Sequence, residues 1–172
     1  MKLSVYFALT PRRRGLRAWL FSGVLRLVEG KSYNHVFGVL EDDLGTRSCW
    51  NIFSWSKPWS EYSPQNVIDS YDIEKKVEID ITATEYANIR NTFEGFVGRH
   101  YAVGRLLLIP LYRLTRWDFL TDPPGVTCTY GLGRALQNAE MWNNQMPPAM
   151  AGLEEVENVV DGLQRSRDKS LN

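Results

Sequence analysis

The sequence predicts an α+β domain in which a small antiparallel sheet packs against helices. Three observations lead to this fold class. Short runs of β-forming residues fill much of the first half of the chain. Segments whose apolar residues recur at helical spacing lie before, after and between them. The length of 172 residues suits one domain, and a hydrophobic content of 44% is enough to build its core.

The first elements follow from local pattern. A short strand is expected at Lys2–Leu9, and Pro11 ends it. Apolar residues recur at helical spacing over 16–27, which predicts a helix. Tyr33–Leu40 and Thr46–Phe53 are rich in β-formers and flank a polar turn. These two segments therefore predict a β-hairpin.

The middle of the chain alternates between aromatic and β-type segments. An aromatic loop is expected at Trp55–Pro64, because three large rings lie there close to two prolines. Asn66–Ile73 is predicted as a strand, and so is Lys76–Ile81, where apolar and charged residues alternate cleanly.

Helices dominate the second half. Thr82 and Glu85 have the spacing of a capping box, which opens a helix closed by Gly98. A further helix is expected from Cys128, directly after a Pro-Pro-Gly break. We divide the chain into a domain over 1–150 and a polar C-terminal helix and tail over 151–172.

The overall charge excludes one class of function. Twenty basic and twenty acidic side chains cancel, which argues against a protein built around nucleic-acid phosphates. The N-terminal 31 residues are nevertheless basic. They hold Lys2, Arg12, Arg13, Arg14, Arg17, Arg26 and Lys31 against Glu29 alone. Two interpretations stay open: a peripheral contact with anionic lipid, phosphate or a cell-wall polymer, or an ordinary solvated helix face with acidic contacts elsewhere in the fold.

The sequence also bears on location. No apolar run reaches the ~18–20 residues that a membrane helix needs. The short apolar run at Leu3–Leu9 is followed by arginines where a signal peptide would have a small-residue cleavage site. We therefore expect a cytoplasmic protein, with a phage-encoded or delivered protein as the alternative.

Few side chains could carry chemistry. The chain has two cysteines, Cys49 and Cys128, and two histidines, His35 and His100. A cysteine nucleophile needs a base, usually a histidine, and a helix N-terminus stabilises its thiolate. Cys128 lies at such a helix start and His35 lies within a predicted strand, so these two form the candidate pair. Cys49 has neither feature and is expected to pack in its strand.

Several segments resemble the circularly permuted NlpC-type superfamily of papain-like cysteine peptidases. These proteins open with a helix and then carry a histidine strand, here Ser32–Leu40. A Gly-x-x-Tyr element follows, here Gly98–Tyr101, and a cysteine at a helix start comes last, here Thr127–Leu132. The order of the three elements matches over roughly residues 15–140. Many members have Ser-Glu after the cysteine, whereas this chain has Thr129 and Tyr130.

The resemblance implies a circularly permuted papain-like fold and a cysteine hydrolase that needs no cofactor or metal. Cys128 would be the nucleophile and His35 the general base. The third residue, which orients the imidazole, is left open among Asn51, Ser48 and Glu41. Asn51 is the best chemical match, because its amide oxygen can accept from the ring N–H.

The expected substrate is a peptide, a glycopeptide or an acyl compound, and peptidoglycan stem peptides lead because they are the superfamily's commonest substrates. Tyr101 would lie near the cleft. Trp55 and Trp59 could stack on a sugar, although the aromatic cluster could equally plug the end of the sheet. The alternative function is a non-catalytic binding module on the same fold, or an isopeptidase or acyl hydrolase.

Overall fold

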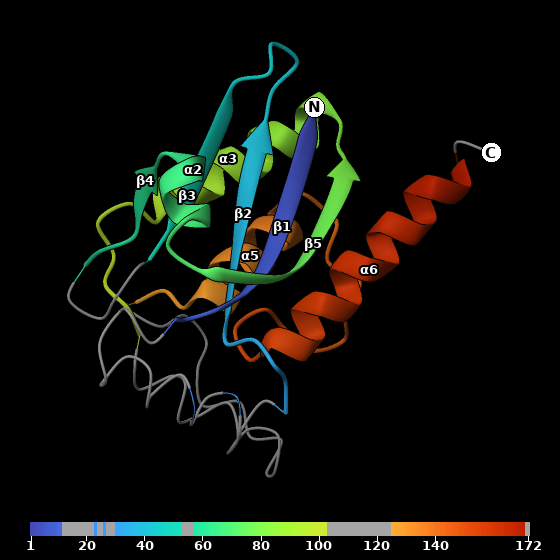
Figure 1. The fold of residues 1–172 in the computed structure, drawn as a ribbon. Helices are drawn as coiled ribbons and strands as arrows, with labels where there is room; N and C mark the ends of the chain where they lie inside the picture. The colour runs from blue at the N-terminus through green and yellow to red at the C-terminus, as the bar shows by residue number, and fades with distance from the viewer. Residues whose placement is uncertain (12–22, 24–25, 27–29, 53–56, 103–124, 171–172) are drawn as a thin grey trace.

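The computed structural model describes residues 1–11, 23, 26, 30–52, 57–102 and 125–170. Within these residues the chain is a mixed α+β structure built on a five-stranded antiparallel sheet (Figure 1). The strand order is β4-β3-β2-β1-β5. The bounds are Lys2–Leu9 for β1, His35–Glu41 for β2, Arg47–Asn51 for β3, Ser60–Tyr62 for β4 and Asp72–Asp80 for β5. The helix predicted over 16–27 lies largely outside the described residues.

The predicted hairpin is confirmed. β2 and β3 pair antiparallel, with Gly38 opposite Trp50. The turn between them is held by Asp42, whose side-chain oxygen accepts the backbone N–H groups of Leu44 and Thr46. Gly45 has a φ of 78°, a conformation that glycine adopts without strain. The polar turn therefore fixes which residues of β2 and β3 lie opposite each other.

The strand predicted at Asn66–Ile73 is wrong. Helix α2 spans Pro64–Ile68, and β5 begins only at Asp72. Proline at the start of α2 is favourable because its fixed φ suits a first helical turn and its missing N–H is not needed there. Within this short helix Val67 is fully buried, and it belongs to the smaller core described below.

Helix α3 spans Ala83–Gly95 and begins with the predicted capping box. Glu85 N donates to the Thr82 hydroxyl at 3.2 Å, and Thr82 N donates to the Glu85 carboxylate at 2.7 Å. Ile89 and Phe93 are fully buried on its inner side. Val97 is 53% exposed, because the helix ends two residues before it.

The helices cover the two faces of the sheet unequally. Helix α5 (Cys128–Asn138) packs along β2, and α3 packs beside α5. With α6 (Leu153–Ser170) they enclose the main core, which includes Leu3, Val36, Trp50, Phe93, Leu132 and Val156. A smaller core lies on the other face under α2, and it includes Phe37, Val39 and Tyr71. Along β2, residues whose side chains face α2 therefore alternate with residues whose side chains face α5.

Helix α6 is less polar than its sequence suggests. Its residues Leu153, Val156, Val159 and Val160 are buried in the same core as the sheet, so the segment after residue 150 has no separate core. Figure 1 shows α6 running along the β5 side of the sheet.

An ionic network fastens α6 to the sheet. Glu157 accepts from Lys75 and Lys31, each at 2.8 Å, and from the Tyr33 hydroxyl. Lys75 also reaches Asp161 at 2.8 Å. Burial alone would raise the pKa of Glu157, but hydrogen bonds from Lys31, Lys75 and Tyr33 lower it to about 2.

Two basic residues of the N-terminal segment make acidic contacts within the fold. Lys31 pairs with Glu157, and Lys2 pairs with Glu78 at 3.5 Å. Arg12, Arg13 and Arg14 fall outside the described residues. No described helix is both long and apolar enough to cross a bilayer.

Candidate active site

Cys128 is the first residue of α5, and the chain leading to it is tightly held. Thr127 caps the helix by accepting the backbone N–H of Tyr130 at 3.1 Å. Just before it, Val126 pairs with Tyr101 in a short parallel bridge. A Cβ on Gly125 would lie 2.7 Å from the backbone oxygen of His100, so glycine is required for this close approach. The bridge therefore brings Tyr101 next to the start of α5.

The Tyr101 side chain contacts Cys128. Its hydroxyl and the cysteine sulfur are hydrogen-bonded. Burial, the ionisable groups of Cys128 and Tyr71 nearby, and this hydrogen bond together raise the pKa of Tyr101 well above its usual range. The hydroxyl therefore stays protonated at neutral pH, and it is the donor to the sulfur.

His35 is the first residue of β2 and is 6% exposed. Its Nε2 lies 2.8 Å from Oδ1 of Asn51, which ends the neighbouring strand β3. Asn51 is almost completely buried. The hairpin brings these two side chains together on one face of the sheet, as neighbours on a diagonal between adjacent strands.

The proton positions on this pair follow from a third group. The backbone N–H of Ile52 donates to Oδ1 of Asn51 at 2.8 Å, and an N–H can only donate. The acceptor atom is therefore the amide oxygen, which settles the orientation of the side-chain amide. Because Oδ1 is an acceptor, Nε2 of His35 must carry the proton. Nδ1 is then the basic nitrogen of the neutral ring.

The other candidates for the orienting residue lie far along the sheet. Ser48 is paired with Leu40. Glu41 ends β2 and lies 3.6 Å from Arg47. Five or six residues along a strand correspond to about 16–20 Å, beyond the reach of either side chain to His35. Of the three candidates, only Asn51 hydrogen-bonds the imidazole.

Tyr71 packs against the imidazole of His35. Its ring stacks on the His35 ring, with centroids 4.6 Å apart and planes 13° from parallel. Tyr71 also lies near enough to Tyr101 to raise its pKa. The predicted site residues are thus in contact in two groups, His35 with Asn51 and Cys128 with Tyr101. Tyr71, which no sequence motif marks, stacks on His35.

The two tryptophans proposed to bind substrate differ in outcome. Trp55 lies outside the described residues. Trp59 is 3% exposed, and its indole N–H donates to the backbone oxygen of Phe93 at 3.1 Å. A Cβ on Gly131 would lie 2.7 Å from the Trp59 ring, so this ring packs directly against the first turn of α5. The proposed substrate-stacking role of Trp59 is wrong, because its ring is a core residue beneath the cysteine helix.

The remaining cysteine and histidine occupy different settings. Cys49 is fully buried in β3, and burial raises the pKa of its thiol to about 12. It packs in its strand, as predicted. His100 is exposed, and its backbone oxygen accepts the N–H of Val126.

Two further observations limit the chemistry of the site. In the described part of the chain, no three His, Cys, Asp or Glu side chains gather closely enough to hold a metal ion. Nδ2 of Asn51 is buried and makes no hydrogen bond with any described residue. An unsatisfied buried donor costs about 1–3 kcal/mol. The oxygen of the same amide orients His35.

This arrangement has the parts of a thiol–imidazole pair: a cysteine at a helix start, a histidine whose Nε2 carries a proton, and an amide that fixes the ring. A scan of the sequence against models of protein families finds no match, and a search of curated proteins likewise finds none.

Proposed function

We propose that this protein is a cysteine hydrolase of circularly permuted papain-like fold that cleaves an amide bond. The observation that carries the proposal is the 2.8 Å contact between His35 Nε2 and Asn51 Oδ1, because it leaves Nδ1 as the base. Cys128 at the first position of α5 supports the same chemistry, since the N-terminal N–H groups of a helix favour a thiolate.

The reaction would proceed in two halves. Nδ1 of His35 takes the proton of the Cys128 thiol, and the sulfur attacks the carbonyl carbon of the amide. Backbone N–H groups at the start of α5 stabilise the oxyanion. The imidazolium then gives its proton to the leaving amine as the C–N bond breaks. Water, deprotonated by His35, hydrolyses the thioester and restores the thiol.

Asn51 and Tyr101 have supporting roles in this scheme. Asn51 holds the ring so that Nδ1 stays available, and it stabilises the imidazolium through Nε2–H. The Tyr101 hydroxyl donates to the sulfur in the resting state, which stabilises negative charge there. Tyr71 covers one face of the imidazole and limits its rotation.

The substrate class rests on the resemblance. Peptidoglycan stem peptides lead, with another peptide, an isopeptide or an acyl compound as alternatives. Incubation of purified peptidoglycan with the protein, followed by mass spectrometry of released fragments, tests this part. Fragments formed by the wild type and not by Cys128→Ala would support it. If the peptidoglycan stays intact while the Cys128 thiol is shown to be activated by the labelling experiment below, the substrate assignment fails but the proposed Cys128/His35 pair is retained.

The pair itself is tested by iodoacetamide labelling across pH, with the labelled cysteine identified by peptide mapping. We expect Cys128 to react well below pH 8, and His35→Ala to move its reactivity up to that of a free thiol, near pH ~8.5. Asn51→Leu should slow labelling at pH 7 by roughly 10–100-fold, because it removes a hydrogen bond to a group that becomes charged.

The chain offers two internal controls. His100→Ala should leave the labelling profile unchanged, because that histidine is exposed and it is its backbone oxygen that holds Val126. Cys49 should stay unlabelled near neutral pH, because it is buried with a thiol pKa of about 12. Labelling of Cys128 that His35→Ala does not change would overturn the proposal and favour a non-catalytic binding module.

A further inference from the structure

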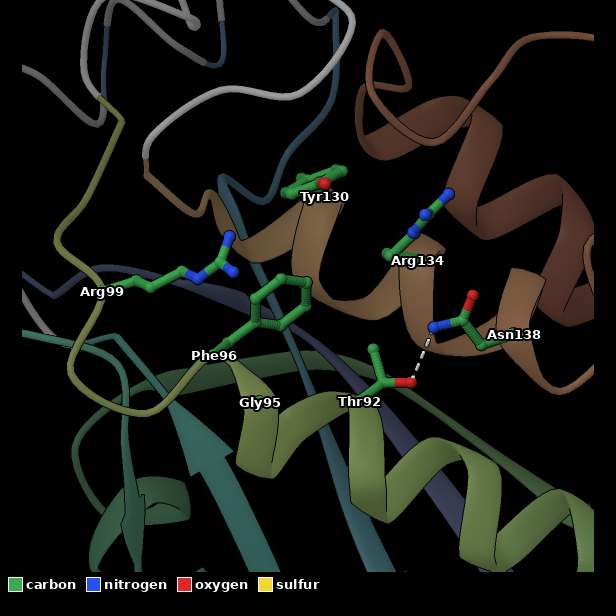
Figure 2. A pocket seen from close by; sticks show the side chains of 7 residues that line it. All are labelled: Thr92, Gly95, Phe96, Arg99, Tyr130, Arg134 and Asn138. Carbon is green, nitrogen blue, oxygen red and sulfur yellow. Dashed lines mark hydrogen bonds between the residues drawn. The ribbon is translucent and has the colours of Figure 1, made fainter.

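A pocket lies between α3 and α5, on the side of α5 that faces α3 (Figure 2). Its volume is about 420 Å³, within the range typical of small-molecule sites. The lining residues come from both helices and the segment after α3. They are Thr92, Gly95, Phe96, Arg99, Tyr130, Arg134 and Asn138. None of them belongs to the candidate active site.

The charged side chains that line the pocket are cationic among the described residues. Arg99 and Arg134 both lie on its wall, and no carboxylate of the described residues lines it. Within the described residues neither arginine forms an ion pair: Arg134 donates to the Gln137 amide oxygen, and Arg99 lies over the Phe96 ring at 5.2 Å. By contrast, Arg90 on the same helix α3 is paired with Glu94 at 2.8 Å. The pocket therefore concentrates positive charge that no carboxylate of the described residues neutralises.

These arginines are not needed to complete helix α3. The backbone oxygen of Phe93 accepts from Phe96 N and from the Trp59 indole. The oxygen of Phe96 accepts from Arg99 N. The helix end thus finds its donors in the backbone and in Trp59, and neither guanidinium serves as a cap for these two carbonyl groups.

The pocket is also preorganised. The backbone of Arg99 is held at both ends, since its N–H donates to Phe96 and its oxygen accepts from Trp59. Its guanidinium rests on the Phe96 ring, which in turn packs 5.6 Å from the ring of Tyr130. On the opposite rim, Asn138 donates to Thr92 at 3.0 Å and ties α5 to α3. These side chains are therefore held in place before a ligand arrives, so binding costs little side-chain entropy.

We propose that this pocket is a binding site for a small ligand that carries an oxyanion, either a carboxylate or a phosphate. The planar fork of an arginine matches both groups and can donate two hydrogen bonds to one oxyanion. The rings of Phe96 and Tyr130 offer an apolar surface to the remainder of the ligand. The inference does not depend on the proposed hydrolase activity.

Isothermal titration calorimetry of the full chain tests the proposal, in a low-salt buffer free of other oxyanions. The probes are inorganic phosphate and succinate, titrated separately. We expect saturable binding of at least one probe, weakened as NaCl is added. Tighter binding of phosphate assigns the site to phosphoryl ligands, and tighter binding of succinate assigns it to carboxylates.

Substitutions locate the binding. Arg99→Gln and Arg134→Gln should each weaken it by about tenfold or more, and the double substitution should abolish it. Arg90→Gln is the matched control and should bind like the wild type, because that arginine is already paired with Glu94. Unchanged circular dichroism and thermal midpoints establish that the variants fold. No saturable binding of either probe at millimolar concentration, or binding that survives the double substitution, would overturn the proposal.

Discussion

Glu157 gives the clearest quantitative test of how α6 is held. Its carboxylate accepts hydrogen bonds from Lys31, Lys75 and the Tyr33 hydroxyl. These contacts lower its pKa from 4.5 to about 2. Glu157→Gln keeps the shape of the side chain and removes its charge. The pKa falls by about 2.5, and each pKa unit corresponds to ~1.4 kcal/mol. The upper limit for the stabilisation by the charged carboxylate is therefore near 3 kcal/mol.

Solvent screening reduces that limit. The Glu157 side chain is only 15% exposed, but its partner Lys75 is 32% exposed. We therefore expect Glu157→Gln to lower the free energy of unfolding by about 1–2 kcal/mol at pH 7. In a domain of this size, that corresponds to a fall in Tm of roughly 2–8 °C.

The effect should depend on pH with a definite sign. The pKa of Glu157 is lower in the folded state than in the unfolded state, so its contribution is fully present above about pH 5. It is lost progressively as the pH falls from about 5 toward 2 and the folded carboxylate takes up a proton. Urea unfolding of the wild type and Glu157→Gln at pH 7 and pH 3 measures the difference directly. The gap between them should be smaller at pH 3.

Glu94→Gln is the matched control, because Glu94 pairs with Arg90 and both side chains are about half exposed. Its effect should stay below ~0.5 kcal/mol. A gap for Glu157→Gln that is as large at pH 3 as at pH 7, or no larger than that of Glu94→Gln, would refute this account of the network.

Three further substitutions test other parts of the structure. Thr82→Ala removes the capping hydroxyl of α3 and should lower the free energy of urea unfolding by ~1 kcal/mol; an unchanged value would contradict the capping role. Gly131→Ala should destabilise the fold by about 1–3 kcal/mol in thermal melts, although alanine favours helices, because the new Cβ would lie 2.7 Å from the Trp59 ring. A stabilised variant would disprove that contact. Tyr71→Leu removes the ring stacked on His35 and should slow iodoacetamide labelling of the thiol at the start of α5 at pH 7, with the fold intact by circular dichroism. An unchanged labelling profile would leave Tyr71 with a packing role alone.

The features that the sequence predicted well depend on residues close together in the chain. The capping box of α3 needs only Thr82 and Glu85, three positions apart. The contact between His35 and Asn51 spans 16 residues, but a single hairpin turn joins their strands. Asn51 is the preferred candidate on chemical grounds. Its side-chain oxygen only accepts hydrogen bonds, so it can fix which nitrogen of the His35 ring carries the proton.

The features that were missed depend on contacts between distant parts of the chain. Trp59 lies in a segment that the sequence predicts as an aromatic loop. Its ring packs in the core because Gly131, in the distant helix α5, has no side chain in the way. Tyr71 follows a short helix that was predicted as a strand, and no local pattern places its ring on His35. The buried side of α6 was underestimated because charged residues separate its apolar positions.

The order of the elements along the chain has a consequence for synthesis on the ribosome. All five strands lie between Lys2 and Asp80, whereas α5 begins at Cys128. At usual translation speeds the residues between these two points take about 2–10 s to be made. During that interval the apolar side chains of the sheet that later meet α5 and α6 lack this cover. The nascent chain therefore passes through a stage in which capture by a chaperone, or association with another unfinished chain, competes with folding.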